Sequence, residues 1–446
     1  MRSFKKSLKY VVFILILGLV YAVYSQYPRL NILSGYSAKN MSSSVFVAGR
    51  DANFTDKTDN NFAPVNIADD NVDYDAKFVE TSVYGLMKRR AIYREGLGSV
   101  LVTDDFDENE PFLTPKRIQR MYDTIMRFPY YGSDDQIDTI FQNINYNKLN
   151  VVVNNAFDSI QKTRAIVVIY KDQIIAEKYD EGFDQNSKIL GWSMTKSITS
   201  TLYGILQKQG KLNVSEKAPI DSWKNDERSG ITIHNLLQMN SGLTWSEDYD
   251  KISDATKMLF LAKNMGKIQE DKELAGTPNE LWNYSSGTTN LLSNILRDYF
   301  DSHQEYLDFW YTNLIDRIGM HSMLIETDLT GSYVGSSYGW ATPRDWAKLG
   351  LLYLHKGSWN GEQIFDASWV DYATSPTNTS DGRYGAQIWL NAGGYYPDAP
   401  KELFSFNGYQ GQRVFIVPSK DLVIVRMGLD TMDFNTMLKE IIAQIN

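Results

Sequence analysis

Two short runs of apolar, β-branched residues near the middle of the chain predict a β-hairpin. They cover residues 164–170 and 174–179, and the three polar residues between them form a turn. Beyond the hairpin, apolar residues recur at helical spacing from Ile198 to Leu206, and Gly210 ends the pattern. The chain therefore enters an amphipathic helix soon after the hairpin.

Further strands are predicted toward the C-terminus, followed by a final helix. They are expected at about 384–390, 403–407, 412–417 and 422–427. A long, mostly helical segment, about 195–375, separates these strands from the hairpin. Strands from both ends of a helical middle predict an α/β fold of the α+β type. We expect one mainly antiparallel sheet flanked by helices, with a helical subdomain.

The first 26 residues read as a signal anchor or a signal peptide. Arg2, Lys5, Lys6 and Lys9 precede the apolar run at residues 10–24, and the next charge is Arg29. The run is at the short end for a helix that spans a membrane. An uncleaved anchor in the inner or plasma membrane, through residues 10–25, is favoured over cleavage after Ser25. The remainder is expected on the periplasmic or extracytoplasmic side, or secreted to the periplasm if residues 1–25 are cleaved.

Two further segments follow this signal. Residues 27–134 are expected to form a partly irregular extension, because residues 30–75 are rich in Asn, Asp and Ser and resemble a tether or an irregular coat. A turn and a short strand are predicted within residues 90–102. Residues 135–446 are expected to form the main domain.

Composition excludes several function classes. The net charge is −9 and the pI about 5.2, with no basic block beyond the N-terminus, which argues against a nucleic-acid partner. The chain has no cysteine, so disulfides, thiol nucleophiles and lipid attachment at cysteine are excluded. Its four histidines show no metal-ligand spacing. We expect no metal and no cofactor.

Ser193 and Lys196 are the first candidate catalytic residues. Residues three positions apart on a helix share a face, so the hydroxyl and the amine can meet. A lysine that has lost its water shell can take the proton of a serine nucleophile. The spacing alone is a weak signal, because Ser3/Lys6 and Ser159/Lys162 share it.

Two more motifs follow in sequence. Tyr284-Ser285-Ser286 precedes a predicted helix, where it is either a helix cap or a source of a catalytic phenol. Gly408 and Gly411 lie at the junction between the strands predicted at 403–407 and 412–417. Glycines in such a place indicate a bulge or the close approach of another group, such as a substrate.

In this order the three motifs resemble the serine β-lactamase and penicillin-binding protein superfamily. The likeness covers about residues 150–446 and is to the class C-like branch, which includes carboxylesterases and 6-aminohexanoate-dimer hydrolases. It implies that Ser193 is the acylated nucleophile, Lys196 its base and Tyr284 a second proton-transfer residue. It also implies a substrate-binding or oxyanion role for four residues: Ser286, Gly408, Tyr409 and Gln412. The N–H of Tyr409 would be the second oxyanion donor beside that of Ser193.

Two departures from the family pattern point to the substrate. The family's third motif carries a cation before its Thr/Ser-Gly pair, whereas this chain has Phe406-Asn407-Gly408. Ser286 stands where β-lactamases have Asn. Both favour a neutral small-molecule ester or amide, although the Arg413 side chain is a cation that the sequence leaves unplaced. The alternatives are a penicillin-binding or β-lactam-hydrolysing protein, and a catalytically silent binding domain on a membrane surface.

The likeness also bears on the N-terminal extension. Many relatives carry cysteines near the positions of Ser43 and Ser99, and this chain has none. We therefore expect packing alone to hold the extension together.

Overall fold

The computed structural model describes residues 2–103, 106–107, 111–118, 128–130, 139–158 and 160–445. They form two compact units, each discontinuous in sequence. Unit 1 comprises Met1–Tyr93, Ser99–Phe106 and Asp248–Ala262. Unit 2 comprises Arg94–Gly98, Asp107–Glu247 and Lys263–Asn446. The domain boundary expected between residues 134 and 135 lies outside the described residues.

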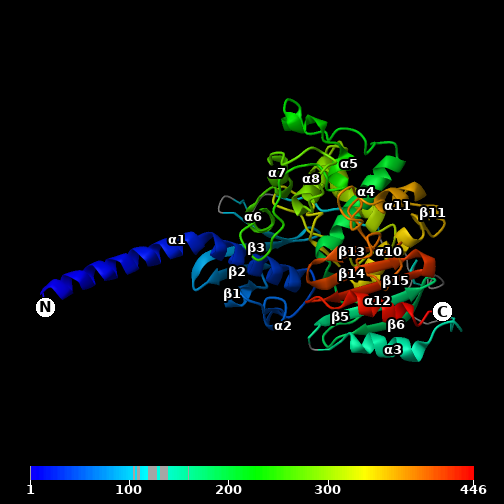
Figure 1. Ribbon diagram of the computed structural model, residues 1–446, viewed down its shortest axis with the longest axis horizontal. Coiled ribbons are helices and arrows are strands. Elements are labelled where there is room, and N and C mark those ends of the chain that lie inside the picture. The colour runs from blue at the N-terminus through cyan, green and yellow to red at the C-terminus, as the bar shows by residue number, and fades with distance from the viewer. Residues whose placement is uncertain are drawn as a thin grey trace. The chain divides into compact units, whose positions relative to one another are not determined.

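Unit 1 contains a long helix and a four-stranded sheet (Figure 1). The helices are α1 (Arg2–Phe46) and α2 (Ala52–Lys57). The strands run in the order β1 (Ala68–Asp73), β2 (Phe78–Val83), β3 (Leu86–Arg94) and β4 (Gly98–Leu101). Met41 and Val45 of α1 pack against Val79 of β2. This small apolar cluster joins the helix to the sheet.

Residues 30–75 are mostly regular, so the expected irregular coat is wrong. Their polar side chains are buried against one another: Asn60 donates to Ser37 Oγ at 2.9 Å and to Asp70 at 3.1 Å. Ser37 Oγ also donates to Asp70, at 2.8 Å. Buried polar groups are stable when they are hydrogen-bonded. A composition that is typical of disorder therefore forms an internal hydrogen-bond network in this unit.

A buried serine pair joins α1 to β4. The Ser42 hydroxyl donates to Ser99 Oγ at 2.8 Å, and both residues are fully buried. The adjacent Ser43 instead accepts from Lys39 Nζ. The hydrogen bond between Ser42 and Ser99 thus lies near the positions, Ser43 and Ser99, at which we expect many relatives to carry cysteines.

Helix α6 (Asp254–Leu261) joins unit 1 from the middle of the chain. The Phe260 ring lies 5.5 Å from the ring of Tyr36 on α1, between centroids. The Phe260 carbonyl accepts from the Arg89 guanidinium at 2.8 Å. Unit 1 is therefore completed by residues far beyond its own N-terminal sequence.

No single helix among the described residues is both long and apolar enough to cross a membrane. The pair Lys9–Ser25 and Tyr27–Phe46 meets the length and hydropathy criteria together, with a 41° bend between its halves. Pro28 lies near this bend, and a proline inside a helix removes one hydrogen bond and produces a kink. An anchor within residues 1–26 stays a prediction.

The main sheet of unit 2 is antiparallel and takes its strands from both ends of that unit's sequence, which confirms the expected arrangement. Its order is β12 (Trp389–Leu390), β13 (Phe404–Gly408), β14 (Gln412–Val417), β15 (Leu422–Gly428), β5 (Thr163–Tyr170) and β6 (Gln173–Tyr179). The predicted hairpin is β5–β6. The strand expected at 384–390 is regular only at its end. β15 pairs with β5, with Ile424 opposite Val168.

The sheet separates two apolar cores. Val414 and Ile416 of β14 face the larger core, where α10 (Pro343–Leu354) packs on the sheet. Phe415 and Val417 face the smaller core, which α3 (Tyr146–Asn155) and α12 (Phe434–Ile442) cover (Figure 1). The other helices of unit 2 are α4 (Thr195–Lys208), α5 (Ile233–Leu237), α7 (Met265–Glu270), α8 (Ser286–Arg297), α9 (His303–Trp310) and α11 (Ala367–Ala373). Its short strands are β7 (Ile189–Leu190), β8 (Leu324–Ile325), β9 (Gly339–Ala341), β10 (Ser358–Trp359) and β11 (Glu362–Gln363).

Candidate active site

Ser193 lies in a tight 3-10 turn, Trp192–Met194, that leads directly into α4. Trp192 has φ 47°, in the left-handed region that few non-glycine residues adopt. Gly191 before it donates to the Gly339 carbonyl at 2.8 Å, and a Cβ at Gly191 would lie 2.2 Å from the Trp346 ring. Strained backbone of this kind persists only where surrounding packing holds it. Ser193 is thus presented by a constrained turn at the start of a buried helix.

Lys196 is 1% exposed, and its amine has three oxygen neighbours. The Nζ atom lies 3.0 Å from Ser193 Oγ, 2.9 Å from Ser286 Oγ and 2.9 Å from the Ser336 carbonyl oxygen. Burial lowers the pKa of Lys196 to about 8, and the negative charge of Glu247 opposes this shift. A neutral fraction of the amine is therefore accessible near neutral pH.

Glu247 is a site residue that the sequence did not reveal. Its carboxylate accepts from the Ser286 hydroxyl at 2.5 Å, from the Ser286 N–H at 2.9 Å and from the Trp245 indole at 2.5 Å. The phrase Trp245-Ser246-Glu247 carries no recognisable spacing to Lys196 or Tyr284. Only the folded chain brings the carboxylate to Ser286.

Tyr284 lies beside both predicted catalytic residues. Its ring centroid is 4.9 Å from Lys196 Nζ, and its hydroxyl is hydrogen-bonded to Ser193. Burial raises the pKa of Tyr284 and Glu247 raises it further, while the bond to Ser193 and the charge of Arg413 act in the opposite sense. The phenol consequently stays protonated at neutral pH and is suited to donate a proton.

Gly408 and Tyr409 lie next to the turn that carries Ser193. A Cβ at Gly408 would lie 2.1 Å from the carbonyl oxygen of Gly191. The Tyr409 ring packs edge-on against Trp192, with 5.7 Å between centroids. The close approach expected from this glycine motif is therefore to the backbone just before Ser193.

Gln412 is oriented toward the protein interior. It is 1% exposed, and its amide donates to the Gly428 carbonyl at 2.5 Å and accepts from the Gly428 N–H at 3.0 Å. The buried Arg426 guanidinium donates to the carbonyls of Gln410 and Gly411 in the turn just before Gln412. These contacts support the turn that follows Gly408 rather than reach toward Ser193.

The position of Arg413 is now defined. Its guanidinium donates to the carbonyls of Gly408 and Gln412, at 2.9 and 2.8 Å. The same group lies over the Phe434 ring, 4.6 Å from the centroid. Because Phe434 belongs to the smaller core, Arg413 leaves the sheet on the face covered by α12.

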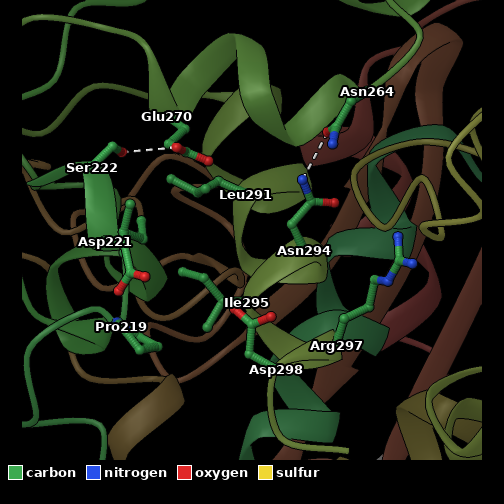
Figure 2. A pocket seen from close by; sticks show the side chains of 11 residues that line it. Pro219, Asp221, Ser222, Asn264, Glu270, Leu291, Asn294, Ile295, Arg297 and Asp298 are labelled. Atoms are coloured by element: carbon green, nitrogen blue, oxygen red, sulfur yellow. Dashed lines mark hydrogen bonds between the residues drawn. The ribbon is translucent and has the colours of Figure 1, made fainter. Parts of the chain in front are cut away.

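A separate cavity of about 670 Å³ lies toward the C-terminal end of α8 (Figure 2). Ser286 starts α8 and Arg297 ends it, so the two lie about 16 Å apart along the helix axis. Polar residues in the wall of the cavity are hydrogen-bonded to one another: Ser222 donates to Glu270 at 2.8 Å, and Asn294 donates to Asn264 at 2.8 Å. Ser193, Lys196 and Tyr284 do not line it. Within the described residues, no cluster of His, Asp or Glu has the arrangement of a metal site.

Comparisons with known proteins agree with this arrangement. A beta-lactamase family model matches residues 156–428. A 6-aminohexanoate-dimer hydrolase of Paenarthrobacter ureafaciens is 23% identical over 296 residues, which cover 59% of this chain and 72% of that protein. These findings confirm the resemblance inferred from the motifs.

Solved structures show the same fold. A family VIII carboxylesterase aligns with a TM-score of 0.55 at 14% identity, covering 68% of this chain and 97% of that one. A penicillin-binding protein homologue from Caulobacter crescentus aligns with a TM-score of 0.53 at 13% identity, covering 69% and 98%. The family model spans more than half of the chain, and the chain therefore belongs to the beta-lactamase family.

Proposed function

We propose that this protein is a serine hydrolase that cleaves an ester or amide bond through an acyl-enzyme on Ser193. The observation that supports it most is the 3.0 Å contact between Ser193 Oγ and the buried Lys196 Nζ. A neutral amine at that distance can accept the serine proton as Oγ attacks a carbonyl carbon.

The charge that develops on the substrate carbonyl oxygen needs donors that are already in place. We assign this role to the N–H groups of Ser193 and Tyr409, because β13 carries Tyr409 to the turn of the nucleophile. Such fixed donors stabilise the negatively charged tetrahedral intermediate more than they stabilise the bound substrate. Gly408 is the residue that permits the approach, and Gln412 supports the turn from inside.

The leaving group must gain a proton as its bond to the carbonyl carbon breaks. Tyr284 keeps its proton because burial and Glu247 raise its pKa, and it is bonded to Ser193. We therefore assign the proton donation to Tyr284, and Lys196 then passes to Tyr284 the proton that it took from Ser193. Water then attacks the acyl-enzyme, and the same groups act in reverse order to release the acid and restore Ser193.

We propose that the substrate has no carboxylate beside the scissile bond. β13 presents Phe406, Asn407 and Gly408, none of which is charged. Arg413 is occupied by two carbonyls and the Phe434 ring. The curated relative is a 6-aminohexanoate-dimer hydrolase, which makes short amides a substrate class to test.

We further propose that residues 10–25 hold the protein at the inner or plasma membrane, with unit 2 outside the cytoplasm. The basic residues before Tyr10 and the exposed apolar side chains between Tyr10 and Tyr24 support this placement. Extraction of membranes at alkaline pH tests it: the full chain should stay in the pellet, and a chain that begins at residue 27 should not.

Covalent labelling tests the main proposal. A fluorophosphonate should add once to the purified protein, and mass spectrometry of its peptides should locate the adduct on Ser193. Ser193→Ala should lose labelling and lower turnover by about 10³-fold or more. An adduct on a different serine would contradict the assignment.

A further inference from the structure

The hydrogen of the Ser286 hydroxyl has a defined direction. It is donated to Glu247 Oε1 at 2.5 Å. An ionised carboxylate only accepts hydrogen bonds, so the bond cannot run the other way. Glu247 is held by two further donors, the Ser286 N–H and the Trp245 indole N–H. The direction of the Ser286 hydroxyl is therefore set from outside the serine–lysine pair.

This direction decides what Ser286 offers to Lys196. With its hydrogen committed to Glu247, Ser286 Oγ accepts from Lys196 Nζ at 2.9 Å. The Ser336 carbonyl oxygen at 2.9 Å also only accepts. A neutral amine has two hydrogens and one lone pair. Both hydrogens are used by these two acceptors, so the lone pair is left for Ser193 Oγ at 3.0 Å.

A reversed Ser286 hydroxyl would have the opposite effect. It would donate to Lys196 and occupy the lone pair that the mechanism needs. Ser193 would then face an N–H of the amine, which cannot remove its proton. We propose that Glu247 is a positioning residue which, through Ser286, aims the basic lone pair of Lys196 at Ser193. This inference rests on the proposed function, because it concerns the same base.

Charge and orientation act in different directions, which makes them separable. The negative charge of Glu247 favours the protonated form of Lys196 and so raises its pKa. Removing only the charge should therefore move the acid limb of the reaction to lower pH. Removing the acceptor as well should lower the maximal rate, because Ser286 is then free to turn toward Lys196.

The test is the pH dependence of the rate at which a fluorophosphonate labels Ser193 in the full-length protein. Glu247→Gln keeps an oxygen for Ser286 and removes the charge, so the acid limb should shift down by about half a pH unit or more. Glu247→Ala should lower the plateau rate by about 10- to 100-fold. Glu270→Ala is the matched control: Glu270 also accepts from a serine, Ser222, and lines the separate cavity.

A double-mutant cycle shows whether Glu247 acts through Ser286. In Ser286→Ala, the further change Glu247→Ala should cost less than threefold, because there is no hydroxyl left to orient. Additive losses, or a wild-type plateau in Glu247→Ala, would overturn the inference. Should Glu247→Ala fail to fold by circular dichroism, the plateau of Glu247→Gln still decides: this variant keeps an oxygen acceptor for Ser286, so a plateau lowered about tenfold or more would also overturn the inference. Labelling that is absent from Ser193 in the wild-type protein would instead refute the proposed function.

Discussion

Gly408 lies against the carbonyl oxygen of Gly191, at a distance that leaves no space for a side chain. A single Cβ there would come within 2.1 Å of that oxygen. Gly191 stands two residues before Ser193, whereas Gly408 ends β13 near the C-terminus. The contact thus joins the turn that carries Ser193 to the strand that leads into Tyr409.

Gly408→Ala should reduce activity strongly while the protein remains folded. The methyl group has to push β13 away from Gly191, which displaces the Tyr409 N–H from the position of the developing oxyanion. Loss of one such donor costs about 10²–10³ in kcat. Steady-state kinetics with an activated ester and a thermal melt of the same sample measure both effects.

Gly230→Ala is the control for this substitution. A Cβ added at Gly230 would meet no atom within 4 Å, and the φ of Gly230 is not in the left-handed region. The activity of the Gly230→Ala variant should equal that of the wild type. Equal activity in Gly408→Ala would show that the strand does not position an oxyanion donor.

Lys196→Met should remove a pH dependence of stability. The pKa of Lys196 is about 8 in the folded chain and about 10.5 when unfolded. Between these values the unfolded chain holds a proton that the native chain has lost, so wild-type stability rises with pH across this window. The rise is about 3 kcal/mol. Urea unfolding at pH 8 and 10.5 should show it in the wild type but not in Lys196→Met; parallel pH profiles would contradict the lowered pKa.

Neutral esters should be better substrates than β-lactams. A β-lactam carries a carboxylate, and Phe406, Asn407 and Gly408 of β13 offer it no cation. The charge-assisted hydrogen bond that is therefore missing, about 1.5–3 kcal/mol, corresponds to a loss of roughly 10- to 150-fold in recognition. The ratio of kcat/KM for p-nitrophenyl butyrate and nitrocefin measures the preference. Arg413→Ala should leave this ratio unchanged, because the guanidinium is bound to Gly408, Gln412 and Phe434. Preference for nitrocefin would favour the β-lactam alternative.

Ser42→Cys combined with Ser99→Cys should form a disulfide in unit 1. The two Oγ atoms are 2.8 Å apart, and the residues are 57 positions apart in sequence. A bridge over such a loop stabilises by about 2–4 kcal/mol. Thiol titration and the difference in Tm with and without reductant are the measurements. Ser43→Cys with Ser99→Cys should stay reduced, since the Ser43 side chain instead meets Lys39.

The sequence alone determined the features that depend on near neighbours. The spacing of Ser193 and Lys196 puts both on one helix face, and the two apolar runs at residues 164–170 and 174–179 form the predicted hairpin. Thr342 caps α10, with Pro343 at its first position, through a contact between near neighbours in sequence. The order of the three motifs was enough to indicate the family.

The tertiary structure decided which distant groups meet. Glu247 and the Ser336 carbonyl reach the lysine site from segments whose sequence carries no signal for it. The polar stretch before residue 75 folds because its side chains find partners in one another, which composition does not reveal. Local spacing constrains a few neighbouring residues, whereas long-range contacts depend on the path of the whole chain. The direction of one hydroxyl at Ser286 is therefore a property of the fold.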